Sequence, residues 1–220
     1  MSLCSTQFTG LVFLDSSNIT TTEGRAIISR STVKSSNFQF LKTDIIFDNV
    51  VFTNITSTDP MQSSSQNSIL VLRANQIRIQ NSAFQMNSVD RAHSLLDIDS
   101  ADDVNISNCT IKDNSGDSET SSIITITNSN QVRFRKIRLL NNDNILISLQ
   151  GKSSSLITSK ATQNFTVDGL DFIESVNTTL QVDTMNSRML NILIEHDTDK
   201  DRPIVKLHEC EADFEVGSLL

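Results

Sequence analysis

The sequence predicts an all-β fold in which the chain winds into a parallel β-helix solenoid with about three strands per coil. Three observations predict it. A short pattern of apolar residues recurs along the chain, the interval between its copies is nearly constant, and polar corners rich in Asn, Asp and Ser separate the copies. The copies alternate with the two-residue period of strands rather than the 3.6-residue period of helices.

The repeated pattern has four apolar positions, with one residue skipped, then two, then one. Two strands of period two are therefore joined by a one-residue phase slip, which turns a corner while both apolar sets keep facing inward. Five copies start about 27 to 33 residues apart, an interval typical of solenoids. They are Ile45-Phe47-Val50-Phe52, Ile77-Ile79-Ser82-Phe84, Val104-Ile106-Cys109-Ile111, Val132-Phe134-Ile137-Leu139 and Phe165-Val167-Leu170-Phe172.

A third strand and two corners complete each coil. The expected third-strand pairs are Ile69 with Val71, Leu96 with Ile98, and Ile124 with Ile126. Asn and Asp suit tight corners because they tolerate a left-handed backbone and form local hydrogen bonds. Stacked Asn side chains also form ladders along the stacking axis. The expected corner residues are Asn75, Asp102 and Asn130 before the pattern, and Asn54, Asn87, Asn114 and Asn141 after it.

Residues 1–220 are predicted to form one β-helix domain or a segment of one. Residues 1–30 suggest an incomplete first coil, and 31–58 give the first clear coil. Polar insertions are expected near 57–67 and 150–163, on either side of the most regular part. Beyond Phe172 the pattern loosens, with Glu195 expected in the third position of the last copy. A β-sandwich or barrel is the alternative fold, whereas the fixed Leu spacing of leucine-rich repeats is missing.

The composition limits the partners and the compartment. A net charge of −8 argues against binding to a nucleic-acid backbone or an anionic membrane surface. No apolar run reaches the length of a membrane span, so we expect no direct membrane insertion, and no signal peptide is visible. Cys109 falls at an inward position, where it is expected to pack as a small hydrophobic residue. The disulfide state of Cys4, Cys109 and Cys210 stays open.

Four carboxylates form the strongest candidate for sugar or calcium chemistry. Asp97 and Asp99 lie on one expected strand, and Asp102 and Asp103 follow at the next corner. Glycoside hydrolysis needs two carboxylates, and clustered oxygen ligands suit Ca²⁺. We nonetheless prefer the interpretation that Asp102 and Asp103 are a corner residue and a solvated neighbour. We expect no catalytic residue, no resident metal and no cofactor; bound calcium is the alternative.

Two further sets of residues are candidates for contact or modification. A basic run points outward from one strand–corner–strand unit; it is either a solvated face beside acidic neighbours or a docking patch for an acidic partner. It comprises Arg133, Arg135, Lys136 and Arg138. Sequons for N-linked glycans, N-x-Ser/Thr, point to a secreted protein. They occur at Asn18, Asn54, Asn105, Asn108, Asn164 and Asn177.

Coils such as ANQIRIQNSAF, ADDVNISNCTI and SNQVRFRKIRL resemble the right-handed parallel β-helix repeats of the pectin-lyase-like superfamily, over roughly residues 38–194. The texture rich in Asn, Ser and Ile also resembles long β-helical surface proteins of ciliated protozoa and adhesin-type repeats. The GHG and RIK motifs of the pectin hydrolases are absent. The resemblance implies the fold and does not imply catalysis, because function resides in sites grafted on folds.

We therefore expect a non-enzymatic structural or adhesive rod segment of a larger extracellular or cell-surface assembly, with other protein segments or subunits stacking on its ends. A polysaccharide lyase, hydrolase or carbohydrate-binding β-helix is the first alternative. An internal scaffold subunit of a filament or large complex is the second.

Overall fold

Parallel strands dominate the protein. The computed structural model describes residues 5–13, 18–21, 24–34, 37–56, 70–89, 94–116, 122–143, 146–150, 164–173, 179–183, 186–195, 205–207 and 211–215. Strand accounts for 73% of the interpretable part, which contains no helix. No described helix is long and apolar enough to cross a membrane. The predicted all-β class is thus confirmed.

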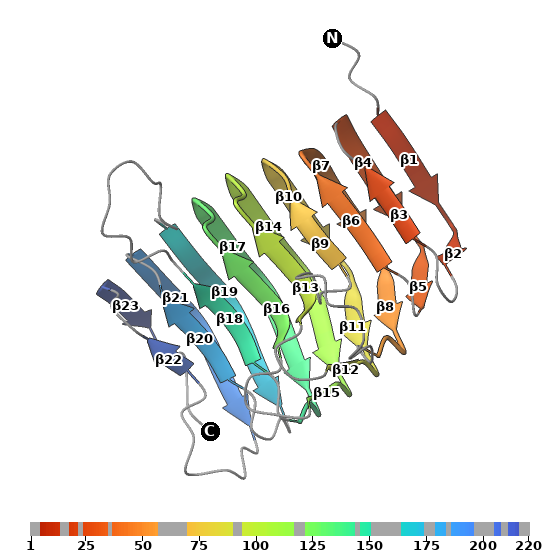
Figure 1. Ribbon diagram of the computed structural model, residues 1–220. Coiled ribbons are helices and arrows are strands. Elements are labelled where there is room, and N and C mark those ends of the chain that lie inside the picture. Colours follow the sequence, from red (N-terminus) through yellow and green to blue (C-terminus); the bar gives the residue numbers. More distant parts are fainter. Residues whose placement is uncertain are drawn as a thin grey trace, which may run out of the picture.

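The first and largest sheet runs through the whole described chain, and its strands follow one another across Figure 1 in sequence order. Its main strands are β1 (Ser5–Thr9), β4 (Gly24–Ser29), β7 (Thr43–Asp48), β10 (Gln76–Gln80), β14 (Asp103–Lys112), β17 (Gln131–Leu140), β19 (Asn164–Ile173), β21 (Asn186–Glu195) and β23 (Glu211–Glu215). Shorter strands of the same sheet are β2 (Val12–Phe13), β5 (Thr32–Lys34), β8 (Val51–Thr53) and β11 (Ala83–Gln85).

The second sheet takes one strand from the chain between successive strands of the first. It comprises β3 (Asn18–Thr21), β6 (Asn37–Leu41), β9 (Leu70–Arg73), β13 (Ser94–Asp99), β16 (Ser122–Thr127), β18 (Leu146–Gln150), β20 (Thr179–Asp183) and β22 (Val205–Leu207). A small third sheet pairs β12 (Ser88–Val89) with β15 (Ser115–Gly116). The chain therefore alternates between the two sheets. We call the segment from the start of one main strand of the first sheet to the start of the next a pass.

The register aligns equivalent positions of the repeated pattern on neighbouring strands. Ile77 pairs with Ile45 on one side and Val104 on the other. Val104 in turn pairs with Val132, and Val132 with Phe165. The pattern alone predicted this alignment, and it is confirmed. The closed winding of the sheets around one axis stays a prediction.

The predicted phase slip is present as a left-handed residue between the two halves of the pattern. In β14, Asn108 has φ 52°, and Ile106 and Cys109 on either side of the slip are both buried. The same backbone state recurs at the equivalent corner of neighbouring passes. Those positions are Arg30 (φ 50°), Asn49 (φ 56°), Asn81 (φ 53°) and Lys136 (φ 52°).

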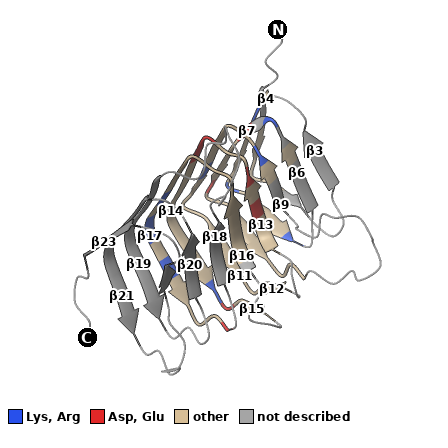
Figure 2. Cartoon of the chain, turned by 60° about the vertical axis from the view of Figure 1, so that its left-hand side comes forward, with Lys and Arg blue, Asp and Glu red and all other residues tan. Residues whose placement is uncertain are grey.

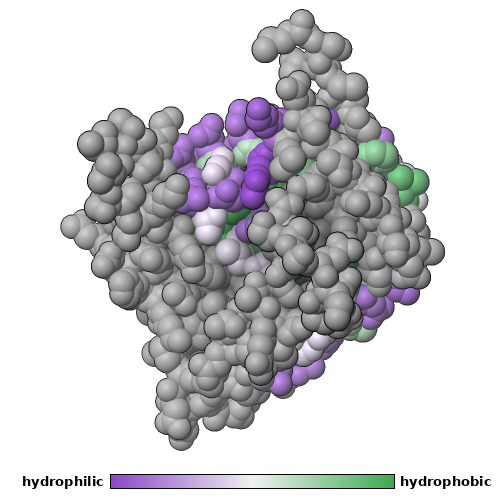
Figure 3. Space-filling view, viewed as in Figure 1, coloured by the Kyte–Doolittle hydropathy of each residue, from purple (hydrophilic) through white to green (hydrophobic). Residues whose placement is uncertain are grey.

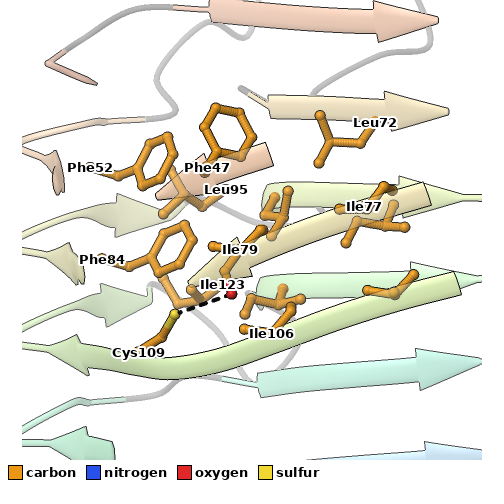
Figure 4. Close-up of a cluster of buried hydrophobic side chains, with 14 of the residues drawn as sticks. Phe47, Phe52, Leu72, Ile77, Ile79, Phe84, Leu95, Ile106, Cys109 and Ile123 are labelled. Atoms are coloured by element: carbon orange, nitrogen blue, oxygen red, sulfur yellow. Dashed lines mark hydrogen bonds between the residues drawn. The ribbon is translucent and has the colours of Figure 1, made fainter. Parts of the chain in front are cut away.

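The core lies between the first two sheets and, among the residues whose side chains are described, forms one cluster from Ala26 to Leu139. Figure 4 shows Leu72, Leu95 and Ile123 of the second sheet in one buried cluster with Ile77, Ile79 and Ile106 of the first. Each fully buried aliphatic side chain contributes roughly 1.5–3 kcal/mol relative to exposure. Aromatic rings stack along the core. Phe52 on β8 and Phe84 on β11 are register partners, and their ring centroids lie 4.8 Å apart with an interplanar angle of 8°.

Two details of the predicted pattern are wrong. Leu70 and Leu72, rather than Ile69 and Val71, pair with Leu96 and Ile98. Residues 69–72 are apolar throughout, so their pattern contained no alternation to select the phase, and pairing with β13 decides it.

The second error concerns the last copy of the pattern. Ile192, and not Glu195, occupies its third position, because Ile192 pairs with Leu170 while Glu195 pairs with Ile173. The predicted insertions near 57–67 and 150–163 fall outside the described residues, except that Gln150 ends β18.

Candidate functional site

The most ordered polar feature is a buried ladder of three asparagines, one from each of three successive passes. Asn87, Asn114 and Asn142 are each at most 2% exposed and follow the second half of the pattern. The side-chain oxygen of Asn114 accepts from the backbone nitrogen of Asn87 at 3.0 Å and from its side-chain nitrogen at 2.9 Å. Asn142 accepts from Asn114 in the same way, at 3.2 and 2.9 Å.

The side-chain nitrogen of each ladder asparagine also donates to a backbone carbonyl of the preceding pass. The side-chain nitrogen of Asn114 donates to the Phe84 carbonyl at 3.0 Å, and that of Asn142 donates to the Ile111 carbonyl at 2.9 Å. Asn87 and Asn114 were predicted as corner residues of a ladder. Asn54 and Asn141 were predicted at the same corner, but both are exposed, with φ 52° and 49°. Their neighbours take the buried position: Asn142 enters the ladder, and the backbone nitrogen of Ile55 donates to the Asn87 Oδ1 at 3.0 Å. Because Asn141 and Asn142 are adjacent and identical in type, the sequence alone could not show which of them is buried.

A second polar set, which sequence analysis missed, uses buried hydroxyls. The Ser82 Oγ donates to the carbonyl of Gln80 at 2.7 Å and accepts from the backbone nitrogen of Val50 at 3.1 Å. Ser31 makes the equivalent pair of bonds, to Ser29 and from Leu11. Each hydroxyl thus bonds one backbone group of its own pass and one of the pass before it. A serine in an apolar slot of the pattern was the available signal.

Cys109 occupies the same slot as Ser82 and has a buried, free thiol. Its Sγ lies 3.2 Å from the Ser107 carbonyl oxygen, and burial raises the pKa of the thiol to about 11. The prediction that it packs as a small hydrophobic residue is confirmed. At neutral pH the group is a protonated thiol and a poor nucleophile. Cys4 and Cys210 lie outside the described residues.

Two of the candidate carboxylates, Asp97 and Asp99, are half-buried on β13 and alternate with the buried Leu96 and Ile98. Figure 2 shows the acidic positions of β13 in red. Burial raises the pKa of Asp97, the charge of Asp99 raises it further, and Arg73 partly opposes them. Burial also opposes ionisation of Asp99, but hydrogen bonds, chiefly from Asn128 and Thr127, outweigh it and lower the pKa of Asp99. Its Oδ1 accepts from the Asn128 Nδ2 at 2.7 Å.

The other two carboxylates belong to a different edge of the pass. Asp102 is exposed in the corner and accepts from the Asn130 side-chain nitrogen at 2.8 Å. Asp103 begins β14 and pairs with Arg133, whose Nη2 lies 3.1 Å from its Oδ1. Asp99, Asp102 and Asp103 thus each bond a side chain of the next pass. Within the described residues, no three His, Cys, Asp or Glu side chains are placed to hold a metal ion.

The basic run lies along β17 and faces acidic positions on both neighbouring strands. Besides Asp103, Arg133 bonds the Gln131 side-chain oxygen at 2.7 Å. On the other side, Asp168 and Asp171 of β19 are the register partners of Arg135 and Arg138. Lys136 is exposed at the left-handed corner.

Three of the six sequons fall where side chains are described. Asn54 and Asn108 are exposed at left-handed corners, at φ 52° each, whereas Asn105 is half-buried within β14. Asn18 and Asn164 lie in β3 and β19, whose side chains are not described, and Asn177 lies outside the described residues.

A ladder on the surface joins the corner of Asn108 to the equivalent corner of the two preceding passes. The Asn108 side-chain nitrogen donates to the Asn81 oxygen at 2.7 Å, and the Asn81 nitrogen donates to the Asp48 Oδ1 at 2.9 Å. In the view of Figure 3, the described surface is mostly hydrophilic, with a hydrophobic area at the end where β1 and β2 lie. Leu11, between those strands, is 41% exposed.

In the asparagine ladder, the serine hydroxyls, the carboxylates and the surface ladder, most polar side chains join one pass to the next. Comparison of the chain with protein-family models, with curated proteins and with solved structures found no match.

Proposed function

We propose that this chain is a non-enzymatic structural module: a right-handed parallel β-helix that forms a rigid rod segment of a larger extracellular or cell-surface assembly. Other protein segments or subunits stack on its ends. Parallel strands joined through a crossover are right-handed in nearly all known sheets, which supports the hand.

One observation carries this proposal: three of the four candidate carboxylates bond side chains of the neighbouring pass. Asp99 bonds Thr127 and Asn128, Asp102 bonds Asn130, and Asp103 bonds Arg133. A general acid or a metal ligand needs at least part of its bonding capacity for substrate or ion. Asp99, Asp102 and Asp103 each use one carboxylate oxygen to hold the next pass, which favours a cohesive role between passes.

Stacking on the ends is supported by the edges of the large sheet. Among the described strands, β1 pairs with β4 and β23 pairs with β21, so each has one edge without a partner strand. Unpaired edges are ready templates for another strand. The register repeats at each interior pairing of the main strands, so an added segment can continue the same parallel arrangement.

A carbohydrate-binding or carbohydrate-cleaving surface is the second candidate, and Asp97 favours it. Its raised pKa and the neighbouring Asp99 with its lowered pKa resemble the division of roles between two carboxylates in glycosidases.

A screen against polyuronates and neutral glycans, with and without Ca²⁺, separates the two candidates. The structural proposal predicts no turnover and no saturable binding for the wild-type chain, and an elongated particle in small-angle X-ray scattering. Each pass adds about 4.8 Å to its length. Turnover that Asp97→Asn or Asp102→Asn abolishes, in a variant that keeps the wild-type circular dichroism spectrum, overturns the proposal. A compact scattering profile overturns the rod.

A further inference from the structure

The sequons at left-handed corners differ from the sequon within a strand in what surrounds the acceptor nitrogen. Asn108 and Asn105 lie three residues apart on β14, yet Asn108 is exposed at a corner and Asn105 is half-buried on the sheet face. The hydroxyl residues that complete the two sequons, Thr110 and Ser107, both lie in the same strand.

Asn105 is enclosed by its neighbours in the sheet. Its register partners are Arg78 on β10 and Arg133 on β17. Adjacent strands are about 4.8 Å apart, so two long side chains flank it on the same face. Its Oδ1 is buried and has no hydrogen-bond partner. A sugar on this side chain has to displace both arginines, including the pair between Arg133 and Asp103.

Asn108 has the opposite surroundings. Asn108 is exposed at the corner, and its side-chain nitrogen donates to the Asn81 oxygen at 2.7 Å. N-glycosylation replaces one of two amide hydrogens, so the other stays available for that bond. Asn54 shares the exposed, left-handed corner geometry, and its sequon is completed by the exposed Thr56.

From these contrasts we infer that Asn108 and Asn54 are acceptors of N-linked glycans in the folded protein and that Asn105 is not. The inference rests on the extracellular location in the proposed function. The donor is a lipid-diphosphate-linked oligosaccharide. The side-chain nitrogen bonds the anomeric carbon, the bond from that carbon to the diphosphate oxygen breaks, the lipid diphosphate leaves with the electron pair, and one amide proton is released.

The consequence for the molecule is a decorated edge. Asn49, Asn81 and Lys136 occupy the same corner as Asn108 on other passes, and Asn54 lies at the other corner of the first sheet. Glycans there project from corners of the passes and leave the sheet faces and the end edges open for protein contacts. A glycan on Asn105 would cover the basic run at Arg133.

The test uses the full chain, secreted from eukaryotic cells behind a secretory leader. The folded fraction is digested with peptide N-glycosidase in H₂¹⁸O, which converts each glycosylated Asn to labelled Asp, and peptides are mapped by mass spectrometry. We expect the label at Asn108 and Asn54 and none at Asn105. Ser107→Thr equalises the hydroxyl residue of the two neighbouring sequons and is expected to leave Asn105 unlabelled.

Two variants remove the Asn108 acceptor by different means. Thr110→Ala breaks the sequon and keeps the asparagine, and Asn108→Asp removes the amide at a position where Asp tolerates the left-handed backbone. Each is expected to lower the intact mass by one glycan. Labelled Asn105, or unlabelled Asn108 in folded wild-type protein, overturns the inference. A secreted, elongated but unglycosylated particle overturns it while leaving the rod intact.

Discussion

The side-chain nitrogen of Asn114 lies 2.9 Å from the side-chain oxygen of Asn142, and both residues are almost fully buried. The two belong to successive passes, so this bond joins parts of the chain that are 28 residues apart in sequence. A buried amide that is fully bonded stabilises a structure, whereas removal of one partner leaves the others unsatisfied.

Asn114→Ala is therefore expected to lower the free energy of unfolding by about 2–4 kcal/mol. The variant leaves the Asn87 backbone nitrogen and the Phe84 carbonyl without the bonds that Asn114 makes to them. Urea denaturation followed by circular dichroism measures the change. The matched control is Asn130→Ala, which removes an exposed amide bond to Asp102 and is expected to change stability by less than about 0.5 kcal/mol. Equal effects of the two variants contradict the role of the buried ladder.

The left-handed corners predict an unusual order of substitutions at Asn81. Ala loses the same side-chain bonds as Gly, but it incurs a steric cost of about 1 kcal/mol at φ 53° that Gly does not. Asn81→Gly should therefore be more stable than Asn81→Ala by about that amount in thermal or urea unfolding. In an ordinary strand position the order is reversed, and a more stable alanine variant would show that the corner is not left-handed.

Burial of Cys109 predicts a loss of stability at high pH. Its pKa rises from 9.0 to about 11 on folding, so the folded state holds its proton over a range where the unfolded state releases it. The thiol's contribution is fully present below pH 9.0 and is lost as pH rises through about 11, at up to about 1.4 kcal/mol per pH unit. Comparing urea unfolding of wild type and Cys109→Ala at pH 8 and pH 10.5 isolates this dependence. Parallel pH curves for the two proteins would rule it out.

Asp97 and Asp99 are predicted to respond to neutralisation in opposite directions. The pKa of Asp99 is lowered on folding, so its charge stabilises the fold above its unfolded pKa, and this contribution is lost as pH falls. Asp99→Asn should thus destabilise the protein at pH 7 and have a smaller effect in acid. The pKa of Asp97 is raised, so its charge opposes folding at pH 7 and Asp97→Asn should be neutral or stabilising there. Melting temperatures at pH 7 and pH 3.5 test both, and a like sign for the two variants at pH 7 refutes the assignment.

The sequence was sufficient for the alignment of passes because the phase slip occurs at a fixed place in each copy. Ile45, Ile77, Val104 and Val132 could be matched from spacing alone, and the strand pairing agrees. Where the spacing was ambiguous, prediction failed. The apolar run at 69–72 contains two possible phases, and only pairing with the neighbouring strand selects Leu70 and Leu72.

The candidate site was less predictable because hydrogen bonds between passes depend on how each polar side chain is oriented as well as on its position in the sequence pattern. Sequence placed Asp99 on a strand and Asp102 and Asp103 at the next corner, but it did not reveal that each bonds a different side chain of the next pass. Asn142 and Asn141 are identical in type and adjacent in sequence. Which one is buried depends on the left-handed backbone of the other.

Each described strand of the large sheet pairs with strands of the adjoining passes, as β17 does with β14 and β19. Contacts of this kind make an array whose stability is a sum of unit and nearest-neighbour terms. Such an array can unfold from its terminal units while the central units stay folded. Amide protons of β14, which has partner strands on both sides, should then exchange with solvent far more slowly than those of β1. After proteolytic cleavage near one end, the rest of the chain should stay folded.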